Sequence, residues 1–252
     1  MSTYGEVLLN GLVDYHFRIF RYDALNPGTK PRFSSYLLQI SPEITVLAAL
    51  LKIRDEMDGT LAFRYSCRSA ICGSCAMVMN GTIGLACRTQ LRTFEERTII
   101  IEPLPNLEII KDLVVDLEPF FAAYRKVRPW LMRKSFPESG EIRQSEEERE
   151  RIERFVGCIL CAACYSACPV PARNPRYIGP AAFAKLARFL FDSRDERSEE
   201  LLEELNDEAG LWGCDTVFKC IEVCPKEIRP TDAIVDLRKM LLKHKIRKLF
   251  RR

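Results

Sequence analysis

The chain has 252 residues, which is enough for one or two domains. Apolar residues make up 47% and charged residues 29%, a composition that is typical of a folded protein and excludes disorder over most of the chain. No apolar run approaches the roughly 18 residues that a membrane-spanning helix needs. The first ten residues lack the basic and apolar regions of a signal peptide. We therefore expect neither a membrane span nor a leader.

The net charge of +3 is unevenly distributed along the chain. Residues 1–237 carry 30 Lys or Arg against 35 Asp or Glu, whereas residues 238–252 carry eight basic residues and no acidic one. A slightly acidic body argues against nucleic-acid binding. The basic tail favours a local contact with something anionic.

The first part of the chain alternates strand and helix patterns. Residues 13–19 alternate apolar and polar side chains with the period of a strand, and residues 33–40 form a second predicted strand after the turn-rich segment DALNPGTKPR. Residues 43–58 have the apolar spacing of an amphipathic helix. Asn80-Gly81 predicts a type I′ hairpin between AMVM and TIGLAC, and residues 98–102 form a further predicted strand.

A first cysteine run lies between the predicted helix and the last of these strands. Its spacing is C-x4-C-x2-C, followed by eleven residues and a fourth cysteine. Plant-type 2Fe–2S ferredoxins have this spacing, whereas structural zinc, the alternative, prefers paired C-x2-C motifs. Gly73 inside the loop lets backbone N–H groups approach the sulfides. We predict a β-grasp ferredoxin domain over residues 1–112 with a 2Fe–2S cluster whose ligands are Cys67, Cys72, Cys75 and Cys87.

The strand signals fade beyond that point. Residues 112–132 predict a helix that bridges the two halves, and KSFPESGEIRQ predicts a loop. Ser145 and Glu148 predict a capping box before a charged helix that ends at Gly157. FAKLARFLF and SEELLEELNDEAG predict two further helices. Residues 113–252 are therefore expected to form an α-helical domain, so that the whole chain is of the α+β class.

Two further cysteine runs lie in this helical half. Residues 158–169 have the spacing C-x2-C-x2-C-x3-C-P of two-cluster bacterial ferredoxins, in which the fourth cysteine binds the other cluster. Residues 214–225 repeat the run with Val217 in place of the second cysteine. With the same crossing, the predicted ligands are Cys158, Cys161, Cys164 and Cys224 for a 4Fe–4S cluster, and Cys168, Cys214 and Cys220 for a 3Fe–4S cluster.

This assignment uses all eleven cysteines. Three thiolates suit a 3Fe–4S cluster, and the side chain of Val217 cannot coordinate iron. The alternative is a 4Fe–4S cluster with a non-cysteine fourth ligand, although no histidine lies nearby in sequence. Because Fe–S clusters carry single electrons, three clusters in one chain predict an electron-transfer protein.

With these motifs the chain resembles the iron–sulfur subunit of succinate dehydrogenase and quinol:fumarate reductase over nearly its whole length. The stretches that carry the resemblance are SCRSAICGSC, DLVVD, GCILCAACYSACP, NPRYIGPAA, DSRDER and CDTVFKCIEVCPKEIRP. None of the twelve glycines forms a G-x-G, and there are two histidines, which agrees with flavin and haem on other chains.

The resemblance implies a place in respiratory complex II and the tricarboxylic acid cycle. Electrons would pass from the FAD of a flavoprotein subunit, which also holds the dicarboxylate site, through the three clusters to a quinone. Membrane anchor subunits with haem b would help to form the quinone site. The chain would be peripheral, on the cytoplasmic face of a prokaryotic cell membrane, with no catalytic residue of its own.

Residues that border the family's quinone site depart from the common pattern. Ala172 and Arg173 replace two tryptophans, and Asp215 replaces a histidine. Pro169 is retained, and Arg238 stands where the family often has lysine, so the resemblance places these two residues near the quinone. The pattern is closer to that of menaquinone-type enzymes.

Several alternatives remain open at the level of sequence. The same role in a quinol:fumarate reductase is one. A subunit of a soluble thiol-linked fumarate reductase or glycolate oxidase is another, although those relatives typically lack the three-cysteine run or add C-terminal domains. A free multi-cluster ferredoxin would have little use for the basic tail. The tail itself is either a solvated helical end or a clamp onto anionic lipid headgroups or anchor loops.

Overall fold

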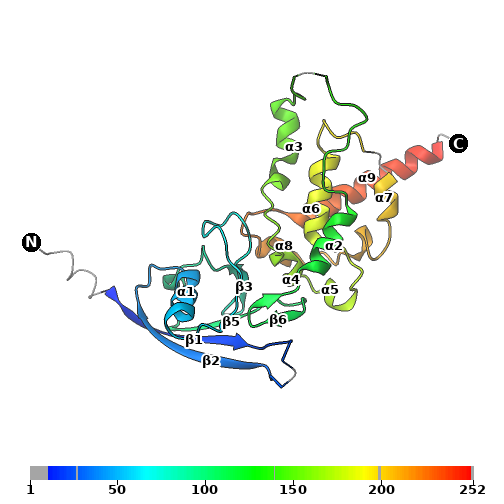
Figure 1. The fold of residues 1–252 in the computed structure, drawn as a ribbon. Helices are drawn as coiled ribbons and strands as arrows, with labels where there is room; N and C mark the ends of the chain where they lie inside the picture. The colour runs from blue at the N-terminus through cyan, green and yellow to red at the C-terminus, as the bar shows by residue number, and fades with distance from the viewer. Residues whose placement is uncertain (1–10, 27, 139, 198–199, 251–252) are drawn as a thin grey trace, which may run out of the picture. The chain divides into compact units, whose positions relative to one another are not determined.

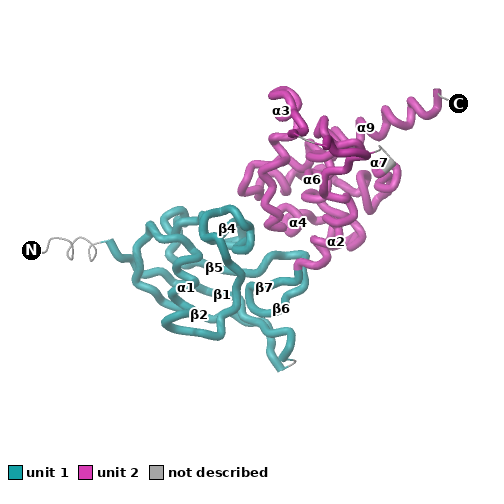
Figure 2. The backbone as a smooth tube through the Cα atoms, turned by 45° about the horizontal axis from the view of Figure 1, so that its top comes forward, with its two compact units in different colours: residues 1–116 teal, residues 117–252 magenta. Residues whose placement is uncertain are grey.

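A computed structural model describes residues 11–26, 28–138, 140–197 and 200–250. The chain divides into two compact units, residues 1–116 (unit 1) and 117–252 (unit 2), which Figure 2 shows in different colours. The division lies four residues beyond the domain boundary expected from the sequence. The expectation about a leader concerns residues 1–10, which lie outside the described residues, as do the last two arginines of the basic tail.

Unit 1 is built on a five-stranded sheet in the order β2-β1-β5-β3-β4. The strands are β1 (Val13–Arg21), β2 (Arg32–Ile40), β3 (Ala76–Met79), β4 (Thr82–Leu85) and β5 (Thr98–Glu102). β1 and β5 are parallel and the other neighbours are antiparallel. Along β1 the side chains of Tyr15, Phe17 and Ile19 are buried, whereas those of Asp14, His16 and Arg18 between them are exposed, which confirms the predicted alternation.

One helix, α1 (Val46–Glu56), lies against this sheet (Figure 1). Thr45 caps its N-terminus, because its hydroxyl accepts a hydrogen bond from the Ala48 N–H at 3.2 Å. Val46, Leu50 and Ile53 are fully buried at helical spacing. The predicted helix is therefore confirmed, and this unit of sheet and helix agrees with the α+β class predicted for the whole chain.

The hairpin between β3 and β4 turns at Asn80 and Gly81. Their φ values are 45° and 76°, as a type I′ turn requires. The Asn80 side chain accepts a hydrogen bond from the Ile100 N–H at 2.6 Å, which fastens the turn to β5. At the other end of the hairpin, the Ala86 N–H donates to the Cys75 carbonyl at 3.0 Å. The hairpin thereby returns the chain, just before Cys87, to the start of β3.

The predicted helix over residues 112–132 is wrong in its first and last parts. Residues 109–115 form a second, two-stranded sheet, β6 (Ile109–Lys111) and β7 (Val114–Val115), because β-branched residues favour strands. Asp112 turns the chain between them, and its buried carboxylate accepts a hydrogen bond from Arg21 Nε at 3.0 Å. The helix itself, α2 (Glu118–Lys126), ends before Pro129, which disfavours helical backbone in the residue before it.

Unit 2 is α-helical, as predicted. Besides α2, its helices are α3 (Glu146–Val156), α4 (Ala163–Ala167), α5 (Val170–Arg173), α6 (Gly179–Leu190), α7 (Glu200–Glu204), α8 (Lys219–Glu222) and α9 (Pro230–Phe250). The capping box of Ser145 and Glu148 is present. Across the described residues, no helix is both long enough and apolar enough to span a membrane.

The helix predicted from SEELLEELNDEAG is shorter than expected. Its first two residues lie outside the described residues, and α7 ends at Glu204. The carboxylate of Asp207 accepts a hydrogen bond from the Gly210 N–H at 2.6 Å, which closes a turn in place of further helix.

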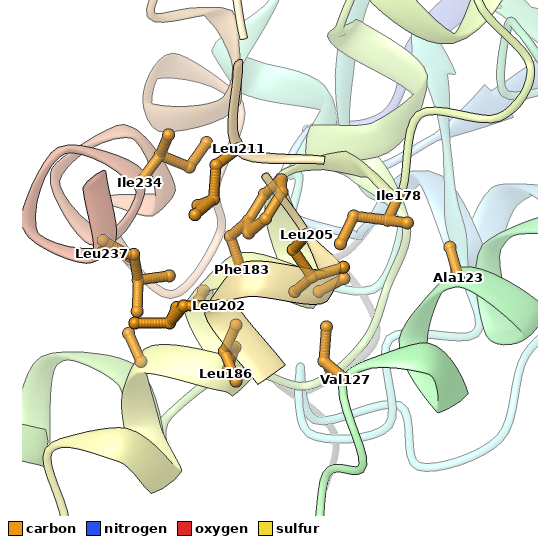
Figure 3. Close-up of a cluster of buried hydrophobic side chains, with 14 of the residues drawn as sticks. Ala123, Val127, Ile178, Phe183, Leu186, Leu202, Leu205, Leu211, Ile234 and Leu237 are labelled. Atoms are coloured by element: carbon orange, nitrogen blue, oxygen red, sulfur yellow. The ribbon is translucent and has the colours of Figure 1, made fainter. Parts of the chain in front are cut away.

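A hydrophobic core centred on α6 and α9 holds unit 2 together (Figure 3). Phe183 and Leu186 of α6 and Ile234 and Leu237 of α9 are at most 1% exposed. Each such side chain stabilises the fold by about 2 kcal/mol through removal from water. The cysteines that belong to this core or pack against it are Cys158, Cys168, Cys214 and Cys224. The cysteine loops are therefore supported directly by the core.

The DSRDER stretch after α6 forms a clamp of buried charges. Arg194 donates two hydrogen bonds of 2.9 Å to the Asp192 carboxylate, whose side chain is fully buried. Arg197 pairs with Asp195 at 2.7 Å, both almost fully buried. Arg197 also donates to the carbonyls of residues 127, 128 and 130. The clamp thus ties the chain that follows α2 to the end of α6.

Candidate metal centres

The predicted 2Fe–2S ligands of unit 1 come from one short stretch of chain. Positive φ values at Arg68 (56°), Ala70 (55°) and Gly73 (73°) curl the loop. The Ile71 N–H points at Cys67 Sγ, with 3.3 Å between nitrogen and sulfur, and the Ala70 N–H lies at the same distance from Cys87 Sγ. Convergent backbone N–H groups of this kind bind anionic centres, including Fe–S clusters.

The thiols in this loop have unequal proton affinities. A hydrogen bond from Ser74 lowers the pKa of Cys72 to about 6. Burial raises the pKa of Cys75 to about 12. A cluster requires all its cysteines as thiolates, so the positive charge of bound iron has to offset the burial of Cys75.

The two cysteine loops of unit 2 have the same backbone conformation. Positive φ values recur at equivalent places, namely Leu160 (55°) and Ala162 (63°) in one loop and Thr216 (60°) and Phe218 (60°) in the other. A short helix, α4 or α8, begins directly after each. Val217 therefore occupies the backbone position of Cys161, which supports the register derived from spacing.

Four cysteines from these two loops line one cavity of unit 2, namely Cys158, Cys161, Cys164 and Cys224. Burial raises the pKa of Cys164 well above its ordinary value, and the nearby thiols of Cys161 and Cys158 raise it further. Burial and the neighbouring Cys158 and Cys224 raise the pKa of Cys161 to about 11. The last cysteine of the third run thus joins the first three of the second run.

The remaining three cysteines form a second group. Burial raises the pKa of Cys168 to about 11, and the thiols of Cys220 and Cys214 contribute to the rise. Cys220 Sγ lies 3.1 Å from the hydroxyl oxygen of Thr231. Hence Cys168 of the second run lies near two cysteines of the third, the arrangement that a crossing of the two runs requires.

Both groups suit clusters of several irons. No group of three or more His, Cys, Asp or Glu side chains in the described part of the chain could hold a metal ion together. Cysteines of a cluster bind different irons of one cage, so they need not converge on one point. Backbone N–H groups also face the sulfurs, as from Thr216 to Cys214 (3.4 Å) and from Ile228 to Cys224 (3.3 Å). Buried, clustered thiols with N–H donors fit 4Fe–4S and 3Fe–4S clusters.

The two residues expected near the quinone both border the second group. Pro169 follows Cys168 directly and is exposed. Arg238 of α9 donates hydrogen bonds to the carbonyls of Leu211 (2.8 Å) and Cys214 (3.1 Å), and its guanidinium lies 5.1 Å from the ring centroid of Trp212. Arg238 therefore positions the loop that carries Cys214.

Two of the positions that depart from the family pattern interact with each other. Arg173 and Asp215 form an ion pair next to the same three thiols. The Asp215 carboxylate is among the charges that raise the pKa of Cys168. The replacements at these two positions are thus matched in charge.

Sequence reasoning missed two residues beside the cysteines. Lys185 of α6 donates from Nζ to the Cys158 carbonyl at 3.1 Å, and burial lowers its pKa. Tyr177 is 1% exposed, with the thiols of Cys214, Cys168 and Cys220 around its hydroxyl. Neither belongs to a motif with a fixed spacing to the cysteines. Both could be found only from their burial on the side of the core that faces the cysteines, which the sequence does not show.

Comparisons with known proteins agree with this arrangement. The family model of a 2Fe-2S iron-sulfur cluster binding domain matches residues 16–122. The family model of a 4Fe-4S dicluster domain matches residues 151–225. The chain is 42% identical over 230 residues to succinate dehydrogenase [ubiquinone] iron-sulfur subunit 1, mitochondrial, of Oryza sativa subsp. japonica, covering 90% of this chain and 82% of that protein.

Two solved structures are similar. A chain of the Mycobacterium smegmatis Sdh1 complex in the apo form matches with a TM-score of 0.84 and 26% identity, covering 93% of this chain and 98% of that one. A hypothetical protein from Helicobacter pylori, with a TM-score of 0.55 and 18% identity, shares the fold; 92% of this chain matches 40% of that one. By its identity to the rice protein and its two cluster-binding units, the chain belongs to the family of succinate dehydrogenase iron–sulfur subunits, the electron-transfer subunits of complex II.

Proposed function

We propose that this chain carries electrons between a flavoprotein subunit with FAD and a membrane quinone through three clusters. In the proposal the 2Fe–2S cluster is held by Cys67, Cys72, Cys75 and Cys87, the 4Fe–4S cluster by Cys158, Cys161, Cys164 and Cys224, and the 3Fe–4S cluster by Cys168, Cys214 and Cys220. When bound, these clusters supply one-electron carriers between a two-electron flavin and the quinone.

The observation that carries the ligand assignment is the crossing in unit 2. Cys224 lines the same cavity as three cysteines about 60 positions earlier in the sequence, while Cys168 lies with Cys214 and Cys220. Val217 occupies the place of a fourth thiolate in the second group, which leaves three. Three thiolates favour a 3Fe–4S cluster over a 4Fe–4S cluster.

The proposal places the quinone beside the second cysteine group. Pro169 is exposed directly after Cys168, and Arg238 holds the Cys214 loop through two carbonyls. The Arg173–Asp215 ion pair occupies the same region, where many relatives have tryptophan and histidine. This polar replacement supports a menaquinone-type site.

The remaining partners follow from family membership. The flavoprotein would hold the dicarboxylate site, and anchor subunits with haem b would hold the complex at the cytoplasmic face of a prokaryotic membrane, with this chain peripheral. In a quinol:fumarate reductase the same chain would work in the reverse direction.

The test is purification of the intact complex from membranes. We expect a covalent flavin, a haem spectrum, an EPR signal of a 3Fe–4S centre in the oxidised state and a 2Fe–2S signal after reduction. Comparing succinate oxidation with quinol-driven fumarate reduction decides the direction. Iron content sufficient for only two clusters would contradict the ligand assignment. Isolation without a flavoprotein would contradict the place in complex II.

A further inference from the structure

The C-terminal half of α9 presents an apolar stripe that the described residues of unit 2 leave largely exposed. Leu242, Ile246, Leu249 and Phe250 are 49%, 55%, 72% and 84% exposed. Their spacing places them on one face of the helix, because residues four and seven apart lie one above the other. In Figure 1 this half of α9 runs out from the rest of unit 2 toward the C-terminus.

The opposite face of α9 packs against the core and α7, so the stripe has a fixed orientation relative to unit 2. Leu237 and Leu241 are fully buried. Further along the same face, Glu203 lies 2.8 Å from His244 Nε2 and accepts a hydrogen bond from Lys248 Nζ at 3.0 Å. These contacts hold the helix against the segment around α7. The helix cannot rotate to bury the stripe without breaking them.

The charges around the stripe indicate what covers it. Residues 237–252 contain no Asp or Glu, and the exposed Lys243 and Lys245 lie on either side of the stripe when the helix is viewed along its axis. A helix with an apolar face flanked by lysines is typical of segments that lie in the plane of a membrane surface. A contact with a protein partner would leave these lysines to be matched by acidic side chains one by one, whereas an anionic bilayer neutralises them without a fixed geometry.

We propose that this face of α9 lies on the surface of an anionic phospholipid bilayer. The side chains of Leu242, Ile246 and Leu249 enter the boundary between headgroups and acyl chains, and Lys243 and Lys245 contact lipid phosphates. The inference rests on the proposed function in that a subunit of a membrane complex has such a surface within reach.

The test uses the full chain with its clusters and vesicles of phosphatidylcholine, with or without phosphatidylglycerol. We expect sedimentation with the anionic vesicles only, weakened by salt because exposed charges are screened. The triple variant Leu242→Ser, Ile246→Ser, Leu249→Ser should bind at least about tenfold more weakly. Leu37→Ser, which removes a comparably exposed leucine from β2, serves as the control.

Three results would overturn the proposal: no binding of the full chain to anionic vesicles, equal binding by the triple variant, or a triple variant that keeps lipid binding but is lost from the complex with the anchor. The last would identify the stripe as a contact with a protein subunit. EPR spectra of the same chain, and dye-linked succinate oxidation by the complex that contains the flavoprotein, report on the proposed function separately, because dye reduction does not need the membrane.

A different observation carries a second inference, about the hydroxyl of Tyr177. Its oxygen is buried and makes no hydrogen bond of regular geometry within the described structure. The surrounding polar groups are the thiols of Cys214, Cys168 and Cys220, with Cys214 within reach as a weak acceptor. The ring lies close against the backbone of Gly213, because a Cβ at that position would come within 2.9 Å of Tyr177 Cδ2. The hydroxyl is therefore directed at the second cysteine group.

A buried hydroxyl with only a weak thiol acceptor within reach destabilises a fold, so the Tyr177 hydroxyl calls for a stronger acceptor. We infer that the Tyr177 hydroxyl donates a hydrogen bond to a sulfur of the cluster that Cys168, Cys214 and Cys220 hold, and so raises its reduction potential. Reduction adds negative charge to the cluster, and a donor stabilises the more negative state. A phenol with an ordinary pKa of about 10 keeps its proton at neutral pH. This inference rests on the proposed ligand assignment.

The test is a redox titration of the 3Fe–4S EPR signal in the complex that carries Tyr177→Phe. The variant keeps the ring and loses the donor, so the ratio of reduced to oxidised cluster at a fixed potential should fall by up to about tenfold, which corresponds to 59 mV for one electron. Tyr124→Phe is the matched control, because Tyr124 lies near Cys158 of the other group. An unchanged potential, or an equal shift in both variants, would overturn the inference. A wild-type complex without a 3Fe–4S signal would instead contradict the proposed function.

Discussion

The two units gather their cysteines in different ways. In unit 1 the four cysteines lie within 21 residues of one another, and the backbone of the same loop supplies the N–H groups that face them. In unit 2 each group combines cysteines from two loops that are more than 40 residues apart, and the loops meet because both pack on the core of α6 and α9. One site is local, and the other depends on the tertiary fold.

In unit 1 the local sequence is enough to place the cysteines, whereas in unit 2 tertiary packing has to bring them together. The loop of unit 1 needs correct turns and the Asn80-Gly81 hairpin, which lie within its own sequence. The groups of unit 2 also need the DSRDER clamp and the buried face of α9, whose residues have no fixed spacing to the cysteines. Damage to the helical core should therefore affect the two groups of unit 2 before that of unit 1.

The largest effect on cluster content should come from replacing the last cysteine of either helical run by serine. Cys224→Ser should remove the 4Fe–4S cluster and Cys168→Ser the 3Fe–4S cluster, because each lies with the cysteines of the other run. EPR spectra and iron content of the purified complex measure this. Each variant is the control for the other. If Cys224→Ser abolishes the 3Fe–4S signal and spares the other, the groups do not cross.

The next largest effect on cluster content should come from adding a cysteine ligand to the second group at position 217. Val217 takes the backbone position of Cys161, so Val217→Cys should supply a fourth thiolate and permit a 4Fe–4S cluster in the second group. Its potential should fall, because an additional anionic ligand favours the oxidised state, and quinone reduction should slow. The measurement is EPR with redox titration. Persistence of the 3Fe–4S signal in a folded variant would show that the register of the third run is wrong.

A smaller effect is expected from Asp192→Asn in the clamp. Hydrogen bonds from Arg194 outweigh burial and hold the pKa of Asp192 at about 2. Since the unfolded value is about 4, the carboxylate should stabilise the fold by about 2 kcal/mol at neutral pH. This stabilisation is present above about pH 4 and is lost as the pH falls toward 2, because the folded-state pKa is the lower one.

Thermal unfolding followed by CD should show the loss for Asp192→Asn, and the difference from wild type should be constant between pH 8 and 5. EPR during the melt adds the comparison of units, with the unit 2 signals lost before the 2Fe–2S signal. Simultaneous loss of all three would contradict the separation of the two units.

The smallest effect should come from Arg173→Ala. Its ion pair with Asp215 is partly exposed to solvent, which screens it, so its loss should change the unfolding midpoint little and leave all three clusters in place. Iron content and unfolding midpoints check this. A loss of the 3Fe–4S signal would mean that the pair supports the Cys168 loop directly.

The sequence predicted unit 1 more completely than unit 2, for reasons that follow from these contacts. Period-two alternation in β1, the turn at Asn80-Gly81 and the cysteine spacing are all local signals. The helix expected over residues 112–132 was wrong in its first part because Asp112 turns the chain through its contact with Arg21, which lies 91 positions away. That contact has no local pattern.

For the sites, the spacing of the cysteine runs predicts the crossing of their ligands, because the two-cluster ferredoxin motif encodes it, and this remains a prediction. The residues that surround the cysteines could not be predicted in this way. Tyr177 reaches the thiols of the second group, and Lys185 reaches the Cys158 carbonyl, only because α6 and the chain before it pack against both loops. The basic tail was recognised from charge, yet its exposed stripe required knowledge of which face Leu241 and Glu203 occupy.

The continuous helix α9 fixes the distance between the second cysteine group and the exposed stripe near the end of the chain. Arg238, which holds the Cys214 carbonyl, and Leu242, the first residue of the exposed stripe, are four residues apart, or about 6 Å along the axis at 1.5 Å per residue. Because the helix is continuous from Pro230 to Phe250, this interval cannot stretch. Whatever surface receives the stripe therefore lies at a set height relative to the thiols, and adding or deleting one residue between the two points would turn the stripe by about 100° away from it.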